Sequence, residues 1–496
     1  MRFLVSVMLV LVALAGCADP ADSPRESNPT PTPTPGVQQF GGTGAAPAAP
    51  PGTPRFHYTG FSGAEPNIGI TSAGNIYVTA FDDTIKSSDG GVTWTSVYNY
   101  DLIQGQVERG TNDPMLWVDT VTDRIYTNHM LGTQCFTMIW SDDEGATWFQ
   151  RDAACTVPVV DHQKVLTSKP GPQSNPQSAR LGTLPGQYPN VVYTCYNAAV
   201  GNQCFASFDG GYTYTQEAVT MSDYDQFGPQ AACSGVAGHP AAAADGTIAI
   251  AAGWNCGPSV SVSLDSGLTW STRPGPQQFG VGASIDPDIT FTADGAMFLF
   301  YRDGAHMARV ARSHDLGATW DGVWNVTAPG LTSTRFHVIS SGDDGHVALA
   351  YLGTDMPRGW TWTDAAGANQ TWEGAPIDAP PDTAWHLYIV TSEDADGNDP
   401  TWTSYKVTPD DDPVQKGCAW EGGGGGGTRS CRNMLDFIDS AVHPDGTFYV
   451  TYTEGCTYRS VPACAGNWTA VEENVSRDRE AAVAALDGWS LYATDD

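Results

Sequence analysis

Short apolar segments recur along the chain from Glu65 onward. Each is opened by a polar residue and followed by a Gly turn and a strand in which apolar and polar residues alternate. Alternation with a period of two is typical of a half-buried β-strand. Seven such alternating strands are predicted, at residues 75–80, 124–128, 191–195, 247–252, 296–301, 346–351 and 447–452. The pattern therefore predicts seven repeated β units.

A second pattern, Ser-x-Asp-x-Gly-x-Thr-aromatic, follows five of these units. The five copies begin at Ser87, Ser141, Ser207, Ser263 and Ser313. A sixth copy, residues 392–402, has three extra residues between its Asp and its Thr. The spacing suits a tight β-hairpin in which the Asp carboxylate accepts backbone N–H bonds, the Gly adopts a positive φ and the aromatic residue covers the sheet.

In these residues the chain resembles the Asp-box (BNR) repeat of sialidase-like β-propellers, where the box joins the third and fourth strands of a blade. The resemblance implies an all-β, seven-bladed β-propeller of four-stranded antiparallel blades. Six blades, as in the sialidases, are the alternative if one unit is a partial blade. The seventh unit has no box, and we expect residues 56–58 to pair with it and close the ring. Asp-box propellers include glycosidases, receptors and assembly factors, so the fold leaves the activity open.

Composition supports many short strands and turns. The 496 residues include 55 Gly and 34 Pro, with 16 Trp, 19 Tyr and 17 Phe, and only 16% are charged. The net charge of −32 argues against binding to nucleic-acid phosphates or to an anionic membrane surface.

The N-terminus has the features of an export signal. Arg2 precedes an apolar run that ends in Leu14-Ala15-Gly16-Cys17, which resembles a bacterial lipobox. We expect residues 1–17 to be a lipoprotein signal peptide with Cys17 lipidated, residues 18–54 a Pro/Thr-rich disordered tether, and residues 55–496 one propeller. The protein would then be an exported monomer, anchored by its lipid in the bacterial cell envelope, at the outer membrane or cell surface. An ordinary secretory signal is the alternative.

Ten further cysteines in an exported chain suggest disulfides. Pairing neighbours in sequence gives Cys135–Cys155, Cys195–Cys204, Cys233–Cys256, Cys418–Cys431 and Cys456–Cys464. A zinc site is the weaker alternative, because no Cys-x-x-Cys pair is present.

The innermost strand of a propeller blade begins at the mouth of the central channel. The residues that open the seven units should therefore form a ring there: Glu65, Asp113, Asp161 with His162, His239, Asp286 with Asp288, Arg335 with His337, and Asp436 with Asp439. Such groups could hold Ca²⁺ or orient sugar hydroxyls. The alternative is that they only stabilise turns before strands.

An insertion at residues 356–384 in unit six holds three tryptophans. We expect it at the channel mouth, where Trp360, Trp362 and Trp372 could stack on sugar rings. The alternative is a small satellite core that fixes the loop.

The resemblance also implies what a sialidase would need. Family members grip the substrate carboxylate with three Arg, use a Tyr activated by a Glu as nucleophile, and use an Asp as acid/base. Their first-blade Arg-Ile-Pro is replaced here by residues 65–67, Glu-Pro-Asn, which puts an acid where the substrate carboxylate would bind. Substitutes are Arg302, Arg335 and Arg109, with Tyr452 and Glu454 on one face of a strand.

Recognition of extracellular glycans is the leading interpretation, with glycoside hydrolysis by an exo-sialidase-like fold left open. The alternative is a non-catalytic cell-surface scaffold that binds a protein partner or Ca²⁺.

Overall fold

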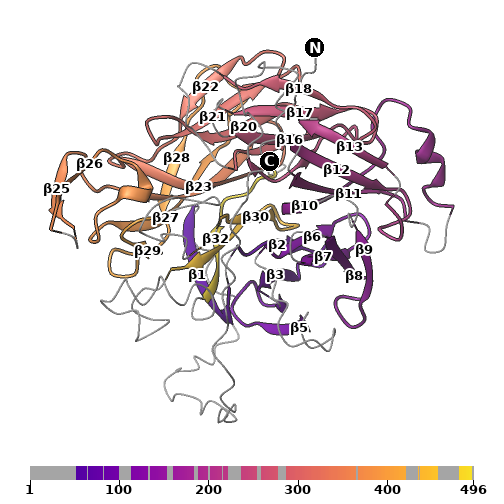
Figure 1. Ribbon diagram of the computed structural model, residues 1–496, viewed down its shortest axis with the longest axis horizontal. Helices are drawn as coiled ribbons and strands as arrows, with labels where there is room; N and C mark the ends of the chain where they lie inside the picture. The colour runs from indigo at the N-terminus through magenta and orange to yellow at the C-terminus, as the bar shows by residue number, and fades with distance from the viewer. Residues whose placement is uncertain are drawn as a thin grey trace, which may run out of the picture. The chain divides into compact units, whose positions relative to one another are not determined.

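Antiparallel β-strands follow one another in seven repeated sheets, shown in Figure 1. The computed structural model describes residues 52–63, 65–81, 83–99, 113–131, 135–153, 160–183, 188–198, 201–214, 216–221, 236–253, 258–276, 286–364, 367–419, 434, 436–455 and 480–493. In this part of the chain the only helical segments are the 3₁₀ turns Pro176–Arg180 and Pro376–Asp378, and none could span a membrane.

Blades 1 to 3 are four-stranded meanders in chain order. They consist of β2 (Ile68–Ile70), β3 (Ile76–Ala80), β4 (Asp83–Ser87) and β5 (Thr95–Asn99); β6 (Met115–Asp119), β7 (Arg124–Leu131), β8 (Cys135–Ser141) and β9 (Phe149–Ala153); and β10 (Val160–Ser168), β11 (Val191–Ala198), β12 (Gly201–Ser207) and β13 (Gln216–Met221).

Blades 4 and 5 continue the series, with the innermost strand of blade 4 split in two. They consist of β14 (Val236–Ala237), β15 (Ala241–Ala242), β16 (Ile248–Gly253), β17 (Ser259–Ser263) and β18 (Ser271–Pro274); and β19 (Asp288–Phe291), β20 (Met297–Arg302), β21 (Ala308–Ser313) and β22 (Gly322–Asn325).

Blade 6 carries the largest addition, a hairpin between its second and third strands. It consists of β23 (Ser333–Ser341), β24 (Val347–Thr354), β27 (Ala384–Ser392) and β28 (Thr403–Lys406), with the hairpin β25 (Trp360–Thr363) and β26 (Asn369–Trp372) and a short β29 (Gln415–Lys416) on β27. Blade 7 consists of β30 (Asp439–Val442), β31 (Phe448–Glu454), β32 (Glu480–Asp487) and β1 (Thr53–Ser62).

The innermost strands close a ring. Contacts run from β2 to β6, β10, β15, β19, β23 and β30, and from β30 back to β2. Strand β1 completes blade 7 by pairing with β32, with Phe56 opposite Ala484 and Tyr58 opposite Ala482. Figure 1 shows this pairing as the indigo β1 beside the yellow β32. The seven-bladed propeller and its closure by residues 56–58 are therefore confirmed, and the six-bladed alternative is excluded.

The core lies between neighbouring blades. Ile70 and Val78 of blade 1 pack with Val483 of blade 7, and Phe300 of blade 5 packs with Leu349 of blade 6. Apolar side chains of neighbouring blades therefore pack on each other between the sheets. This explains why each second strand is buried along its length although its sequence alternates.

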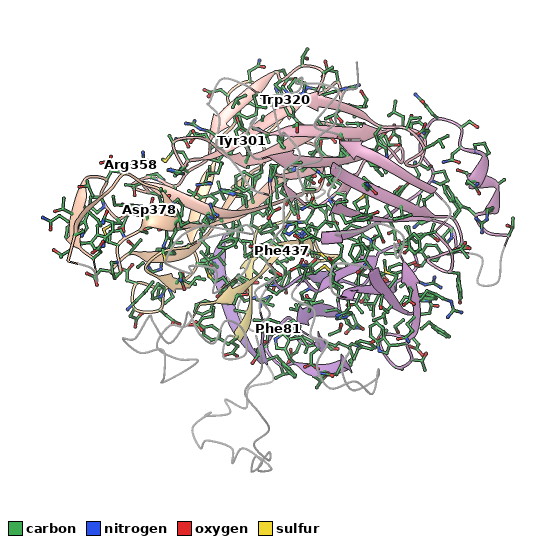
Figure 2. The ribbon with its side chains drawn as sticks, in the orientation of Figure 1. Phe81, Tyr301, Trp320, Arg358, Asp378 and Phe437 are labelled. Atoms are coloured by element: carbon green, nitrogen blue, oxygen red, sulfur yellow. A yellow bond between two sulfur atoms is a disulfide. The ribbon has the colours of Figure 1, made fainter. Side chains whose placement is uncertain are left out.

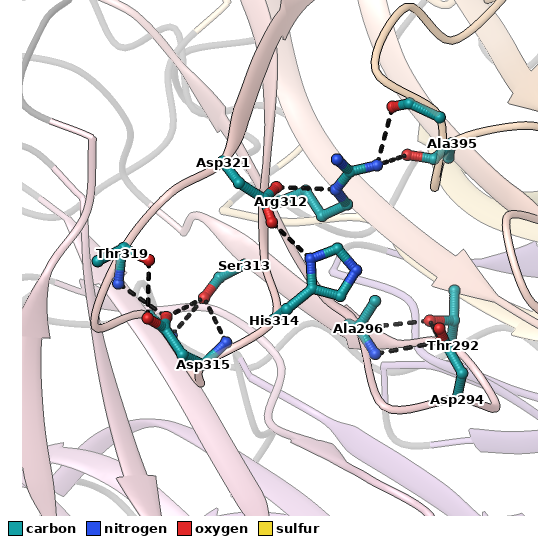
Figure 3. Close-up of polar contacts among 12 residues, drawn as sticks. Thr292, Asp294, Ala296, Arg312, Ser313, His314, Asp315, Thr319, Asp321 and Ala395 are labelled. Atoms are coloured by element: carbon teal, nitrogen blue, oxygen red, sulfur yellow. Dashed lines mark hydrogen bonds and ion pairs between the residues drawn. The ribbon is translucent and has the colours of Figure 1, made fainter.

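Each copy of the repeated motif joins the third and fourth strands of its blade. In blade 5, shown in Figure 3, Asp315 accepts hydrogen bonds from Ser313 Oγ at 2.9 Å and from both the N–H and the hydroxyl of Thr319 at 2.7 Å. Gly317 has a φ of +82° and donates its N–H to Ser313 Oγ at 2.8 Å. The motif is thus a self-contained hydrogen-bonded hairpin.

The expanded sixth copy is fixed by blade 5. Arg312 donates from Nη1 to the carbonyls of Ala395 and Gly397, at 2.8 and 2.9 Å, while its Nε lies 2.8 Å from Asp321 (Figure 3). Carbonyl groups of the extra residues thus accept hydrogen bonds from a buried guanidinium of the neighbouring blade, and these bonds link blades 5 and 6.

One predicted disulfide is confirmed. Cys195 and Cys204 are opposite each other on β11 and β12 and are bonded. Cys418 also forms a disulfide, and its predicted partner Cys431 lies outside the described residues. Each of the other three predicted pairs includes a side chain outside the described part of the chain. Cys17 and residues 18–51 of the predicted tether also lie outside it.

Candidate functional site

Strand direction places the predicted channel residues on one face of the ring. In an antiparallel blade, the start of the innermost strand lies beside the end of the second strand. Asp288, for example, pairs with Phe300, and Asp439 pairs with Thr451. The repeated hairpins between third and fourth strands therefore lie on the opposite face. We call the face with the innermost-strand starts the mouth face.

Six polar side chains from four blades converge inside the ring, and we call them the axial cluster. They are His162, Lys164, His239, Asp286, Asp288 and Asp439. His162 Nε2 lies 2.8 Å from Asp286 Oδ1, and His239 lies 3.9 Å from Asp288 and 3.6 Å from Asp439. Phe437, labelled in Figure 2, packs edge-on against both imidazoles.

Four of the predicted ring carboxylates join neighbouring blades through backbone N–H groups. Asp288 accepts from Ile339 N at 2.9 Å and Asp439 from Ile68 N at 3.0 Å. Asp113 and Glu65 accept in the same way, from His162 N at 3.2 Å and Asp436 N at 2.8 Å. We call these the inter-blade clasps. The inner edge of an innermost strand has no further strand to pair with, so a carboxylate from a neighbouring blade satisfies its N–H.

The clasps change the role expected for these residues. At Glu65, Asp113, Asp288 and Asp439, one carboxylate oxygen holds the ring together. These carboxylates therefore have a structural role, but they bond N–H groups of neighbouring blades and not only the turns before their own strands, as the alternative supposed.

Positive φ angles recur where the chain enters the innermost strands. Glu65, His162, Asp286 and Phe336 have φ between +50° and +55°. At His162 and Phe336 the strand register shifts by a bulge. For residues other than Gly this conformation costs about 1 kcal/mol each. The bulged backbone redirects neighbouring side chains and allows consecutive polar residues to enter the mouth.

Burial shifts the pKa values of several members of the axial cluster. It raises the pKa of Asp439 to about 7 and that of Asp288 well above its usual range, against the hydrogen bonds of the clasps. Burial lowers the pKa of His239, and the charges of Lys164 and His162 add to this effect. The His239 imidazole is therefore neutral.

Lys164 was not predicted as a site residue. Burial lowers its pKa, while Asp286, Asp439, Glu65 and Asp113 act in the opposite direction. Its Nζ lies 3.6 Å from the centroid of the Phe437 ring. Within a strand sequence nothing marks this lysine, because every carboxylate around it comes from another blade.

Asp161 lies at the outer end of this region. It is exposed on the surface, but it stands close to Asp113. Partial desolvation and the Asp113 charge raise its pKa to about 6.

A second group, the arginine cluster, lies on blades 5 and 6. It consists of Arg302, Arg335, Arg358 and His306. Arg302 Nη1 donates to His306 Nδ1 at 2.6 Å. Burial and then the charges of Arg302, Arg358 and Arg335 lower the pKa of His306 to about 4. Three guanidinium groups thus act on one neutral imidazole.

Arg358 is the member that sequence reasoning missed. It lies at the base of the β25–β26 hairpin (Figure 2) and donates to the carbonyls of Ala305 and Thr332. Arg302 and Arg335 are buried, whereas Arg358 is exposed. His337 lies near the two buried arginines, and burial together with their charges lowers its pKa. Arg109 lies outside the described residues.

Tyr452 and Glu454 lie on the same face of β31, as predicted, but both are fully buried. Burial raises the pKa of Tyr452 well above its usual range, and the charges of Tyr58, Glu454, Asp412 and Glu480 act in the same direction. The Tyr452 ring belongs to the apolar core between blades 6 and 7. A nucleophilic phenol would need the opposite shift or a base in direct contact.

The three tryptophans of the insertion divide by burial. Trp360 pairs with Trp372 across the hairpin and is 46% exposed. Trp372 is fully buried in the core and donates its indole N–H to Ala375 O at 2.8 Å. Trp362 is half-buried against the same core. The expectation that Trp372 faces a ligand is therefore wrong, because the hairpin needs an apolar anchor; only Trp360 presents a large open ring.

No group of three or more His, Cys, Asp or Glu among the described residues is arranged to hold a metal ion. Ca²⁺ binding stays a prediction.

No protein-family model matches the chain, and no characterised protein matches it in sequence. Several solved structures have a similar fold. One is a protein of unknown function from Dyadobacter fermentans, which is 15% identical with a TM-score of 0.42; the match covers 89% of this chain and 100% of that one. The phage phi92 endosialidase has 12% identity, a TM-score of 0.44, and coverage of 90% and 70%. The six-bladed Aleuria aurantia lectin has 11% identity, a TM-score of 0.37, and coverage of 71% and 98%. Similarities at this level carry no argument about function.

Proposed function

We propose that the protein recognises acidic glycans at its mouth face, through the arginine cluster. The observation that carries this proposal is the convergence of Arg302, Arg335 and Arg358 on the neutral His306. The chain as a whole has a net charge of −32, so this concentration of positive charge is local. Guanidinium groups bind carboxylates by paired, charge-assisted hydrogen bonds, and they bind best where water is excluded.

Trp360 adds a surface for the sugar ring. It stands two residues from Arg358 on the β25 hairpin, and its indole is exposed. The apolar C–H face of a sugar packs on such a ring while its carboxylate binds the arginines. A carboxylated sugar therefore fits this edge better than a neutral one.

Direct binding tests the proposal. We expect N-acetylneuraminic acid, glucuronic acid or glycans that end in them to bind the wild-type protein in isothermal titration. Arg358→Ala should weaken this binding about tenfold, since one charge-assisted contact is lost. Arg151→Ala, which removes an exposed arginine from blade 2, is the matched control and should leave affinity unchanged. Equal affinity for the acidic glycans and their methyl esters would contradict the proposal.

Hydrolysis is the second candidate function. The resemblance of the repeated hairpins to those of sialidases leaves it open, but the full burial of Tyr452 and its raised pKa weigh against this residue as the nucleophile. Turnover of aryl sialosides or other aryl glycosides that is lost in Tyr452→Phe would establish a glycoside hydrolase. Glycan binding without turnover would leave a recognition protein.

The alternative function, a non-catalytic scaffold that binds a protein partner or Ca²⁺, is tested separately. Binding of a cell-surface protein, or a dependence of glycan binding on Ca²⁺ supply and chelation, would favour it.

We also propose that the propeller works outside the cell, exported and anchored by lipid at Cys17 as a monomer. Metabolic labelling with a fatty-acid analogue, lost in Cys17→Ala, tests the anchor.

A further inference from the structure

Lys164 and Asp286 are oppositely charged and buried inside the ring, but they do not bond to each other. Lys164 is 1% exposed and Asp286 is 7% exposed. Among the residues that the structure describes, neither Lys164 Nζ nor the two carboxylate oxygens of Asp286 have a hydrogen-bond partner. His162 Nε2 lies 2.8 Å from Asp286, but as an ion pair whose geometry is not that of a hydrogen bond.

The two groups nevertheless lie within electrostatic reach. Of the carboxylates that act on Lys164, Asp286 has the largest effect. The ammonium group also lies over the Phe437 ring, which supplies charge attraction but no hydrogen-bond acceptor. A buried donor and a buried acceptor thus act on each other, each without a hydrogen bond.

Buried polar groups in native proteins have hydrogen-bond partners, and leaving one unmade costs about 1–3 kcal/mol. A group that bridges Lys164 and Asp286 must accept from an ammonium and donate to a carboxylate at the same time. A hydroxyl group does both, and so does water. A simple anion or cation satisfies only one side and is repelled by the other.

Exposed and partly exposed polar groups lie near the buried pair on the mouth face. Asp161, three residues before Lys164 on β10, is exposed, and His239 keeps part of its imidazole exposed. A ligand that reaches the pair from this face would first meet these two polar side chains.

We propose that Lys164 and Asp286 together bind a hydroxyl group of a saccharide, which replaces a bridging water molecule. This forms a hydroxyl-binding site inside the ring, separate in its residues from the arginine cluster. The choice of a saccharide as ligand rests on the proposed function. Because this site binds a hydroxyl group, it should accept polyhydroxylated sugar rings whether they are charged or neutral.

Binding to a matched set of sugars tests this site. The ligands are N-acetylneuraminic acid, glucuronic acid, galactose and glucose, with monodeoxy analogues of each, measured by titration calorimetry and saturation-transfer NMR. We expect one monodeoxy analogue to bind the wild-type protein about tenfold more weakly than its parent sugar. Lys164→Met and Asp286→Asn should each abolish this difference, and the double variant should lose no more than either single one.

Lys169→Met and Asp344→Asn are the matched controls. Both residues are exposed in β10–β11 and β23–β24 connections, on the face opposite the mouth, and both variants should keep the difference. Near-ultraviolet circular dichroism shows whether the axial variants fold. If one does not, the monodeoxy comparison on the wild-type protein decides.

The outcomes separate the two proposals. If the parent sugars bind but no monodeoxy analogue loses affinity, or if folded axial variants keep the difference, the hydroxyl site is overturned and the arginine proposal stands. If neutral sugars bind through Lys164 and Asp286 while Arg358→Ala has no effect, the arginine proposal is overturned. If no sugar binds, both are overturned.

Discussion

The Asp288 carboxylate of blade 5 accepts a hydrogen bond of 2.9 Å from the backbone N–H of Ile339 in blade 6. Its other oxygen accepts the N–H of Ile289 in its own strand at 2.9 Å. One side chain therefore holds the innermost strands of two blades in register.

Removing this clasp should destabilise the ring. We expect Asp288→Ala to lower the free energy of unfolding by about 1–3 kcal/mol, because two buried N–H groups lose their acceptors. Asp288→Asn keeps one acceptor oxygen and should lose less. Urea denaturation followed by tryptophan fluorescence measures both. An unchanged midpoint in Asp288→Ala would show that water or a neighbour replaces the clasp.

The repeated hairpins should differ in how much their Asp contributes. Asp315 accepts three bonds from Ser313 and Thr319, whereas Asp394 in the expanded copy accepts one from Ser392 Oγ at 3.0 Å and one from Thr401 N at 2.7 Å. Asp315→Ala should therefore lower the melting temperature more than Asp394→Ala, with losses of about 1–2 kcal/mol and below 1 kcal/mol. The reverse order in calorimetry would contradict the hydrogen-bond account.

Truncation of the two paired tryptophans of the hairpin should have very different effects on stability. Trp372→Ala leaves a cavity in the core of blades 6 and 7 and should cost about 3–5 kcal/mol. Trp360→Ala removes an exposed ring and should change stability by no more than about 0.5 kcal/mol. Chemical denaturation gives both values. Loss of glycan binding in a stable Trp360→Ala protein would add support for the stacking surface.

The titration of Asp439 should lower stability as the pH rises toward neutrality. The pKa of Asp439 is about 7 in the folded protein, against about 4 for an exposed Asp. Between these values the folded state binds more protons than the unfolded state, so raising the pH destabilises the fold, by an amount on the order of 1–4 kcal/mol.

Asp439→Asn should remove this contribution between pH 4 and 7, and Asp344→Asn at an exposed turn should not. Lys164, His239 and Asp288 face Asp439, and Asp288, whose pKa burial also raises, should act in the same direction. Melting temperatures over pH 4–9 measure the effect. A difference in stability between the wild type and Asp439→Asn that stays constant from pH 4 to 7 would contradict it.

Local sequence was enough to predict the units of this fold. The second strands at residues 75–80 and 447–452 begin within a residue of β3 and β31, and the repeated motif lies between third and fourth strands throughout. Alternation, turn residues and a Ser-Asp-Gly-Thr spacing act within a few residues, so they can be recognised from the sequence alone. Cys195 and Cys204 follow the same rule, since they face each other across one hairpin.

The arrangement inside the ring was decided only by tertiary structure. Sequence placed Glu65, Asp113 and Asp288 at the starts of innermost strands, but their partners are backbone N–H groups of other blades, which no local pattern encodes. Lys164 looks like one polar residue in a strand until closure brings Asp286 and Phe437 around it. Side chains of one blade acquire their electrostatic surroundings from the others, and so their chemistry exists only once the ring is closed.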